Sequence, residues 1–287
     1  LSFIAIAKGD VPTRHWFRLG RLLTPVGRDS VLMSWSGSMF EYLMPGLLMR
    51  SPIGSLLEQT CRLAIQRHVE YGGERGVPWG MSESGYNVRD LAMTYQYSGF
   101  GVPGLGLRRG LSDDVVVAPY ATALAAMYEP HDALRNFTAL TAAGADGQHG
   151  FYESVDYTPK RLPAGKTHEV VRMYMAHHQG MVIVAIANAL NAGAMRTRFH
   201  AEPMVRASEL LLQERTPRDG AVARPRVDAA ASRGDVGELV PPHTRHFSSP
   251  HSPVPRTQLL SNGRYAVMVT ASSSGTISRS RLGKRPS

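Results

Sequence analysis

The sequence predicts a mainly α protein in which an α/α toroid-type domain precedes a disordered linker and a short β segment. Before residue 214, apolar helical stripes alternate with long Gly-rich loops, and no repeating strand–helix–strand pattern interrupts them. Residues 215–256 are rich in Pro, Arg, Ala and Ser and cannot bury a core. Tyr265, Val267 and Val269 then recur at every second position, as in a strand.

Five helices are expected in the first part of the chain, over residues of about 54–71, 120–128, 131–143, 170–191 and 203–213. Gly144 suits the end of the third helix, and Pro203 suits the first turn of the fifth. The fourth helix is apolar on nearly every face, so we expect it to be buried. Asn262-Gly263, beside alternating apolar residues, predicts a β-hairpin within 257–272.

These elements divide the chain into residues 1–214, 215–256 and 257–287. The first part is expected to be truncated at its N-terminus, because the apolar run Leu1–Ala7 begins in mid-pattern. The third part is expected to be a β domain that is cut short.

The charge distribution argues against nucleic acid as a partner. The net charge is +9, but the residues from Arg215 onward contain 12 Lys/Arg and only 4 Asp/Glu, so the basicity lies in the linker and tail. The single cysteine, Cys61, excludes an intrachain disulfide. The longest apolar stretch, 181–190, is too short to span a membrane.

The segment between Gly76 and Gly110 combines glycines and prolines with aromatic side chains, which suits the binding of sugars. A pyranose ring presents C–H groups to an aromatic face and hydroxyls to the polar side chains around it. The expected sugar platforms are Trp35, Trp79, Tyr86, Tyr95, Tyr97 and Tyr152. The expected partners of sugar hydroxyls are Glu41, Asn87, Arg89, Asp90, Asp156, His177, His178 and Gln179.

Two carboxylates are candidates for acid–base chemistry. Glu83 lies between two serines, and Glu153 lies in an aromatic segment that ends at Tyr157. Cleavage of a glycosidic bond needs one carboxyl group that donates a proton and a second that stays ionised. Glu41, Glu70 and Asp156 are the alternatives for either role.

His177 and His178 do not predict a metal site. Adjacent residues on a helix point about 100° apart, whereas helical zinc motifs place their ligands four residues apart. No metal and no cofactor are expected. Gly104-x-Gly106 is too short for a dinucleotide fingerprint.

Several segments together resemble the glucoamylase-like domain of cyclic β-1,2-glucan synthases. The resemblance covers residues of about 1–218 in uninterrupted order, and its strongest segments are 34–45, 76–84, 100–107, 117–121, 150–153 and 175–181. Residues 260–267 also resemble the start of the next domain in those proteins, a phosphorylase-like β-sandwich.

The resemblance implies an incomplete (α/α)6-type domain that cyclises a β-1,2-glucan chain by retaining transglycosylation. Glu83 and Glu153 would be the acid/base and the nucleophile, in either order. It further implies a large multipass parent protein with other domains, in which this part lies on the cytoplasmic side of the bacterial inner membrane. Two alternatives stay open, namely a glucan-binding fragment without turnover and a β-glucan hydrolase.

Overall fold

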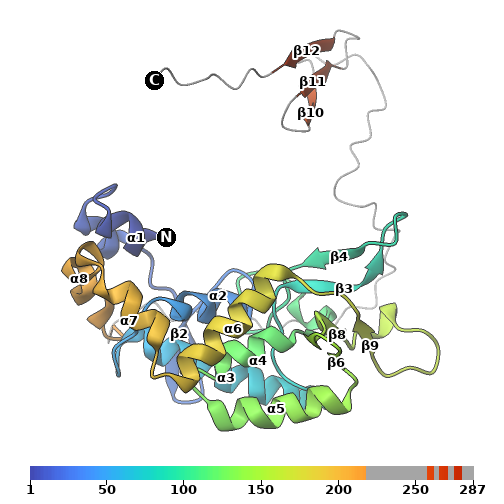
Figure 1. Ribbon diagram of the computed structural model, residues 1–287, viewed down its shortest axis with the longest axis horizontal. Coiled ribbons are helices and arrows are strands. Elements are labelled where there is room, and N and C mark those ends of the chain that lie inside the picture. Colours follow the sequence, from blue (N-terminus) through green and yellow to red (C-terminus); the bar gives the residue numbers. More distant parts are fainter. Residues whose placement is uncertain (218–256, 262–264, 271–274, 280–287) are drawn as a thin grey trace. The chain divides into compact units, whose positions relative to one another are not determined.

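The computed structural model describes residues 1–217, 257–261, 265–270 and 275–279 (Figure 1). The chain divides into two compact units, Leu1–Ala231 and Ser232–Ser287. Of the expected linker 215–256, only residues 215–217 are among those described.

The first unit is mainly helical, as expected, with short strands between the helices. Its helices are α1 Ser2–Ala7, η1 Thr13–Arg18, α2 Met39–Leu43, η2 Met44–Leu47, α3 Leu56–Arg75, η3 Leu111–Asp113, α4 Pro119–Ala125, α5 Pro130–Ala142, η4 Pro159–Arg161, α6 Ala176–Leu190, α7 Ala194–Ala201, α8 Pro203–Ser208 and η5 Glu209–Gln213. Its strands are β1 Leu23–Val26, β2 Asp29–Leu32, β3 Ser84–Arg89, β4 Tyr95–Ser98, β5 Val116–Val117, β6 Asp146–Gly147, β7 Gly150–Phe151, β8 Ser154–Asp156 and β9 Glu169–Val171.

Helix α3 confirms the first predicted helix and extends it. The Ser55 hydroxyl caps its start by accepting from the Glu58 N–H at 3.2 Å. Gly76, with φ of 65°, ends it in the left-handed conformation that glycine adopts without strain. Glu70 therefore lies inside the helix, where Gln66 donates to its side chain at 2.8 Å.

Helix α4 is the centre of the core, because every one of its residues is buried. It packs against α5 and α6, and Figure 1 shows it between them. Pro119 occupies the first turn, where the missing N–H costs no helical hydrogen bond. The Asn136 side chain on α5 ties the backbone of Trp79 to this core, with bonds of 3.0 and 2.9 Å to its N–H and carbonyl.

Helix α6 corrects two expectations about residues 170–191. Its start lies at Ala176, because Glu169–Val171 form strand β9 and pair with β8 instead. Only one stripe of the helix is buried, and Ile183 and Leu190 are 69% and 78% exposed. The expectation of burial on all faces is wrong because the described elements cover just one side of this apolar helix.

The expected fifth helix consists of two elements, α8 and the 3₁₀ helix η5. Helix α7 precedes it and was not anticipated. A second hydrophobic cluster joins this end of the unit to the N-terminal segment through Phe3, Ile6, Trp16, Val205 and Leu212. The indole N–H of Trp16 donates to Glu214 at 2.9 Å.

The segment between Gly76 and Gly110 is more regular than a loop, since β3 and β4 form an antiparallel hairpin within it. Its last part packs against the chain around Ser36 and Gly37. A Cβ placed on Gly101 would lie 1.9 Å from the Ser36 carbonyl oxygen, and a Cβ on Gly106 would lie 2.6 Å from the Ser36 carbonyl carbon. Only glycine permits this approach of two backbones.

The second unit contains a three-stranded antiparallel sheet in the order β10-β11-β12, formed by Thr257–Ser261, Tyr265–Thr270 and Gly275–Arg279. Strands β10 and β11 confirm the predicted hairpin, with Ser261 paired to Ala266 across the turn. Strand β12 was not predicted. In the part of the chain that the structure describes, no helix combines the length and hydropathy needed to cross a bilayer.

Candidate active site

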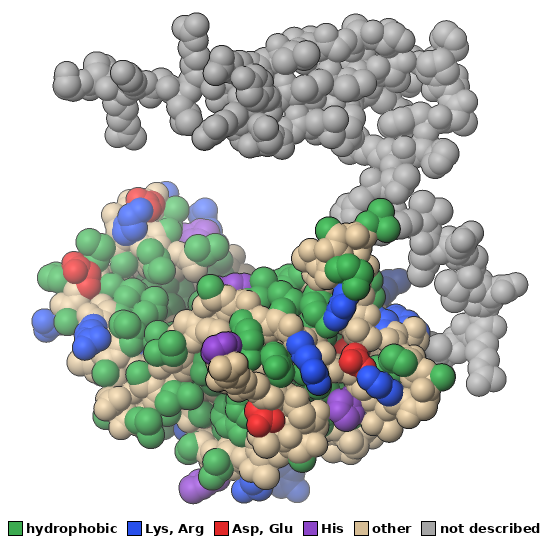
Figure 2. All heavy atoms as spheres, turned by 45° about the vertical axis from the view of Figure 1, so that its right-hand side comes forward, with side chains coloured by type: hydrophobic (Ala, Val, Ile, Leu, Met, Phe, Trp, Pro, Cys, Tyr) green, Lys and Arg blue, Asp and Glu red, His purple; other side chains and the backbone are tan. Residues whose placement is uncertain are grey.

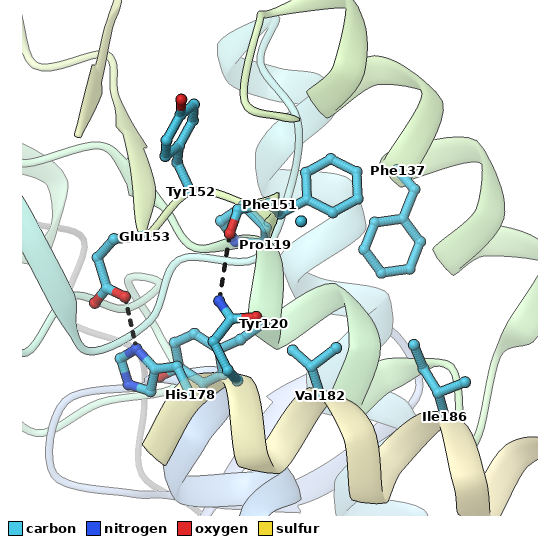
Figure 3. Close-up of a pocket in the computed structure, with 11 residues that line it drawn as sticks. Pro119, Tyr120, Phe137, Phe151, Tyr152, Glu153, His178, Val182 and Ile186 are labelled. Carbon is cyan, nitrogen blue, oxygen red and sulfur yellow. Dashed lines mark hydrogen bonds and ion pairs between the residues drawn. The ribbon is translucent and has the colours of Figure 1, made fainter. Parts of the chain in front are cut away.

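Glu153 lies between β7 and β8, and only 2% of its surface is exposed. Its Oε1 accepts from the backbone N–H of Gly85 at 3.1 Å, and its Oε2 lies 3.0 Å from Nδ1 of His178. Figure 3 shows the carboxylate directed at the His178 ring. Because buried polar groups need partners, these two contacts hold the carboxylate in one orientation.

Gly85, the second residue of β3, allows this strand to approach Glu153 closely. A Cβ at this position would lie 3.3 Å from Cγ of Glu153 and 3.0 Å from Sδ of Met173. The Ser154 hydroxyl donates to the Gly85 carbonyl at 2.5 Å. The N–H and the carbonyl of Gly85 therefore bind the side chains of Glu153 and of the next residue, Ser154.

The His178 ring, on the first turn of α6, is 1% exposed and stacks on the phenol ring of Tyr120. The ring centroids are 3.8 Å apart and the planes differ by 14°. Nε2 of His178 lies 3.3 Å from the Tyr97 hydroxyl. Both ring nitrogens thus face protein groups, which leaves neither directed at solvent.

Glu83 immediately precedes β3 and is held mainly through its backbone. Its N–H donates to the Ser38 hydroxyl at 3.2 Å, and its carbonyl accepts from the Tyr120 hydroxyl at 2.8 Å. Ser82 connects the two, since its hydroxyl lies 3.0 Å from that of Ser38 and 2.8 Å from that of Tyr120. The half-buried carboxylate of Glu83 lies beside Tyr97.

Tyr97, on β4, therefore lies beside both candidate carboxylates. Partial burial raises the pKa of its phenol, and the neighbouring Glu83 carboxylate, which shares a hydrogen bond with the phenol, and Glu153 raise it further. The Tyr97 hydroxyl consequently stays protonated at neutral pH and acts as a donor between the two sides of the site.

A cavity of about 390 Å³ adjoins this cluster. Glu153, His178 and Tyr152 lie at one part of its wall, and Figure 3 shows the apolar side chains of Phe137, Phe151, Val182 and Ile186 on the other. The Gln179 side chain, which also lines the cavity, donates to the Phe151 carbonyl at 3.3 Å.

His177 differs from its neighbour in being exposed. Desolvation and the adjacent His178 lower its pKa, so its imidazole is neutral near pH 7 and available as a hydrogen-bond donor or acceptor. The two histidine rings are 4.0 Å apart between centroids. Within residues 1–217 and the described strands of the second unit, no group of three or more His, Cys, Asp or Glu residues is arranged to hold a metal ion.

Four predicted residues lie along the β3–β4 hairpin. The Tyr86 ring packs on Phe100 at 5.5 Å, and the Arg89 guanidinium lies 4.3 Å above the Tyr95 ring. Asp90 closes the turn of the hairpin by accepting from the N–H groups of Ala92 and Thr94, both at 2.9 Å. This hairpin extends from the site residue Tyr97.

Four other predicted residues have structural partners of their own. Trp79 is 7% exposed and belongs to the core, while Glu41 completes a capping box with Ser38 at the start of α2. Asp156 is fully buried and paired with Arg161 at 2.7 Å. Asn87 donates its N–H to Asp156 at 3.0 Å. Trp35 is 67% exposed and is not among the residues that line the cavity.

The sequence interpretation assigned no role to Tyr120, Ser38, Ser82 or Gly85. A serine before a helix is an ordinary cap and a glycine an ordinary loop residue, so neither type signals a site. Tyr120 had one useful signal, because an aromatic side chain beside Pro119 at the start of an all-buried helix needs a partner for its hydroxyl.

Residues 1–203 match the model of the Glycoamylase family, whose members are described as glucoamylases, and the chain belongs to this family of carbohydrate-active proteins. It is also 48% identical over 274 residues to the cyclic β-(1,2)-glucan synthase NdvB of Rhizobium meliloti (strain 1021), which confirms the resemblance found in the sequence. That match covers 96% of this chain and 10% of the relative, so the chain spans a small part of the relative's length.

Two solved structures are similar in part. One, from Bacteroides caccae ATCC 43185 and described as a glucoamylase, is 18% identical with a TM-score of 0.49, over 69% of this chain and 47% of that one. The other, a β-1,2-glucanase from Parabacteroides distasonis, is 19% identical with a TM-score of 0.46, over 66% of this chain and 26% of that one.

Proposed function

We propose that this domain cuts and rejoins β-1,2-glucan chains by retaining transglycosylation, with Glu83 and Glu153 as its two catalytic carboxylates. The observation that carries the proposal is their common neighbour. Tyr97 lies between His178, which binds Glu153, and the carboxylate of Glu83. Two acids gathered around one tyrosine beside a cavity are the pair of groups that glycosidic chemistry needs.

The two carboxylates differ in their burial and in the hydrogen bonds that hold them. Glu153 is buried and accepts two N–H donors, whereas Glu83 is half-buried and is oriented by bonds to its own peptide group. Different surroundings are how two similar acids take the roles of proton donor and nucleophile. The order of the two roles stays open in the proposal.

The sugar platforms in this proposal are the aromatic side chains with accessible faces. Tyr97 is 39% exposed beside the carboxylates, and Tyr152 lines the cavity. Tyr86 and Tyr95 continue along the hairpin, with His177, Arg89 and Gln179 available to sugar hydroxyls. Trp79 and Asp156 are less suited to bind sugar, because both are buried among protein partners.

The identity to a much longer synthase supports a place for this domain within a larger protein. We propose that it belongs to a multipass protein of the bacterial inner membrane, on the cytoplasmic face, beside other domains of the same chain. The exposed apolar side of α6 supports an incomplete (α/α)6 toroid, since further helices would cover Ile183 and Leu190.

The test is incubation of the purified chain with linear β-1,2-glucan, followed by mass spectrometry. Cyclic products, each one water lighter than the linear chain of equal length, are expected. They should disappear in Glu83→Gln and in Glu153→Gln. Glu74→Gln, which changes an exposed carboxylate on α3, is the matched control and should keep the activity.

Two other outcomes separate the alternatives. Shortened linear products alone would identify a hydrolase, in which water replaces the sugar acceptor. Saturable glucan binding without any product would identify a binding fragment, and the uncovered apolar face of α6 is the observation that favours this second candidate.

A further inference from the structure

His178 was expected to bind sugar hydroxyls, but its ring has no surface left for them. It is 1% exposed, and its two nitrogens face Glu153 and Tyr97. One face of the ring is covered by Tyr120, which stacks on it at 3.8 Å. The side chain is therefore committed to other protein groups.

The contact with Glu153 sets the tautomer of His178. A carboxylate accepts only, so the 3.0 Å contact requires a proton on Nδ1. In the neutral ring, Nε2 is then an acceptor and faces the Tyr97 hydroxyl at 3.3 Å. The phenol has one proton to donate, and the Glu83 carboxylate is its other neighbour.

We propose that His178 is a positioning residue and that, together with Tyr97, it couples the protonation states of Glu83 and Glu153. The inference rests on the proposed function of these two carboxylates. When Glu83 is ionised, the Tyr97 hydroxyl donates to it and leaves Nε2 of His178 free. When Glu83 holds a proton, the same hydroxyl turns to Nε2. No covalent bond changes in this step, because only the O–H group rotates.

Tyr120 joins the two sides a second time. Its ring supports His178, while its hydroxyl donates to the carbonyl of Glu83 at 2.8 Å. Tyr120 therefore contacts both the peptide group of Glu83 and the His178 imidazole, which orients Glu153. The titratable groups that face His178 come from several elements, namely Glu153, Tyr97, Tyr120 and His177, and Glu83 lies one step further, beside Tyr97.

The first test reads the histidine directly and needs no turnover. Long-range ¹H–¹⁵N NMR of the ring nitrogens of His178 is recorded in the whole chain across pH 4–8. We expect the Nδ1–H tautomer, and a pH-dependent change at Nε2 that is transmitted by the Tyr97 hydroxyl. Tyr97→Phe should remove that dependence, whereas Tyr95→Phe, on the same strand, should leave it in place.

Two substitutions then separate the two bonds of His178 in glucan turnover. In His178→Asn, the side-chain amide replaces Nδ1 and keeps a donor to Glu153. In His178→Gln, it replaces Nε2 and keeps a partner for Tyr97. We expect His178→Gln to lower kcat by about 10²-fold with a smaller change in KM, since a misplaced catalytic group costs about this much. His178→Asn should retain more of kcat and show a shifted pH profile.

The outcomes distinguish this inference from the proposed function. An Nε2–H tautomer, or identical NMR titrations in the wild type and Tyr97→Phe, would overturn the coupling even if the enzyme is active. Coupled titration in a chain without turnover would support the inference and count against the proposed function alone.

Discussion

The rings of His178 and Tyr120 lie nearly parallel, with centroids 3.8 Å apart and planes inclined by 14°. His178 lies in the first turn of α6 and Tyr120 in the first turn of the buried helix α4. Their stacking holds the first turn of α6 against the centre of the core. It therefore also holds His178 in place beside Glu153. The precision of the site is thus set by the packing of two helices.

Tyr120→Phe tests how much the hydroxyl contributes beyond the ring. The substitution keeps the stacking on His178 but leaves the Glu83 carbonyl without its 2.8 Å donor. An unsatisfied buried acceptor costs about 1–3 kcal/mol, so we expect a decrease of this size in the free energy of unfolding, measured by urea denaturation. The control is Tyr157→Phe, which should lower the free energy of unfolding by less. The centroid of the Tyr157 ring lies 5.3 Å from that of His168. Equal losses in the two variants would contradict the role of this hydroxyl.

The site shows what the sequence could and could not predict. Glu83 and Tyr97 were predicted from a Gly-rich segment with aromatic residues, and Glu153 from a separate aromatic segment; the structure brings the three side chains together, and their roles stay predictions. The buried states of Trp79, Asp156 and His178 were not foreseen. Burial depends on contacts made across the fold, such as those of Trp79 with Asn136 and of His178 with Glu153, which no local pattern reveals.

The fold shows the same limit. Helix α3 was recognised from its apolar stripe, and the β10–β11 hairpin from its turn residues. Residues 170–175 were assigned to a helix because Val170 and Val171 continue the apolar run, although they pair with Ser154 and Val155 in a strand. Short apolar runs fit either structure, and tertiary pairing decides between them.

Gly101 and Gly99 provide a matched test of the backbone contact that anchors the Gly-rich segment. A Cβ on Gly101 would meet the Ser36 carbonyl oxygen at 1.9 Å, whereas a Cβ on Gly99 has its nearest neighbour at 3.8 Å. Overpacking costs about 1–3 kcal/mol or more, so Gly101→Ala should lower the free energy of unfolding by at least this amount. Gly99→Ala should change it by less than about 0.5 kcal/mol. Chemical denaturation of both variants decides the matter, and a neutral Gly101→Ala would refute the close approach.

His68 predicts a dependence of stability on pH. Complete burial lowers the pKa of its imidazole to about 3, and its Nε2 lies 3.1 Å from the Gly37 carbonyl. Between pH 6.5 and 3 the unfolded chain binds a proton at this residue that the folded chain does not, so this contribution to stability decreases as the pH falls. The slope approaches about 1.4 kcal/mol per pH unit from one such group.

Urea denaturation at pH 7 and pH 5 checks this prediction in the wild type and in His68→Leu. The variant should be less stable at pH 7, because it loses the bond to Gly37, and its stability should fall less toward pH 5. His131→Asn, which changes an exposed histidine on α5, should keep the wild-type slope. A slope that survives in His68→Leu would show that another group causes the pH dependence.

Truncation of a side chain to alanine is expected to lower the stability on one side of α6 but not on the other. Met181 is 9% exposed and packs in the main core, whereas Ile183 is 69% exposed. The face of residues 1–217 seen in Figure 2 carries many hydrophobic side chains. Exposure of an apolar residue therefore does not by itself distinguish an open face from one that packs against another molecule. The cost of removing each side chain does distinguish them, because only a buried side chain leaves a cavity.

Met181→Ala should lower the free energy of unfolding by about 2–5 kcal/mol, the usual range for a large-to-small change in a core. Ile183→Ala should change it by less than about 0.5 kcal/mol, since alanine favours the helix and the isoleucine has little contact to lose. Both values follow from urea denaturation monitored by circular dichroism at several protein concentrations. A loss in Ile183→Ala that grows with concentration would mean that a second copy of the chain covers this face. A large loss at every concentration would mean that the face is covered within the chain itself, and the assignment of an open side to α6 would be wrong.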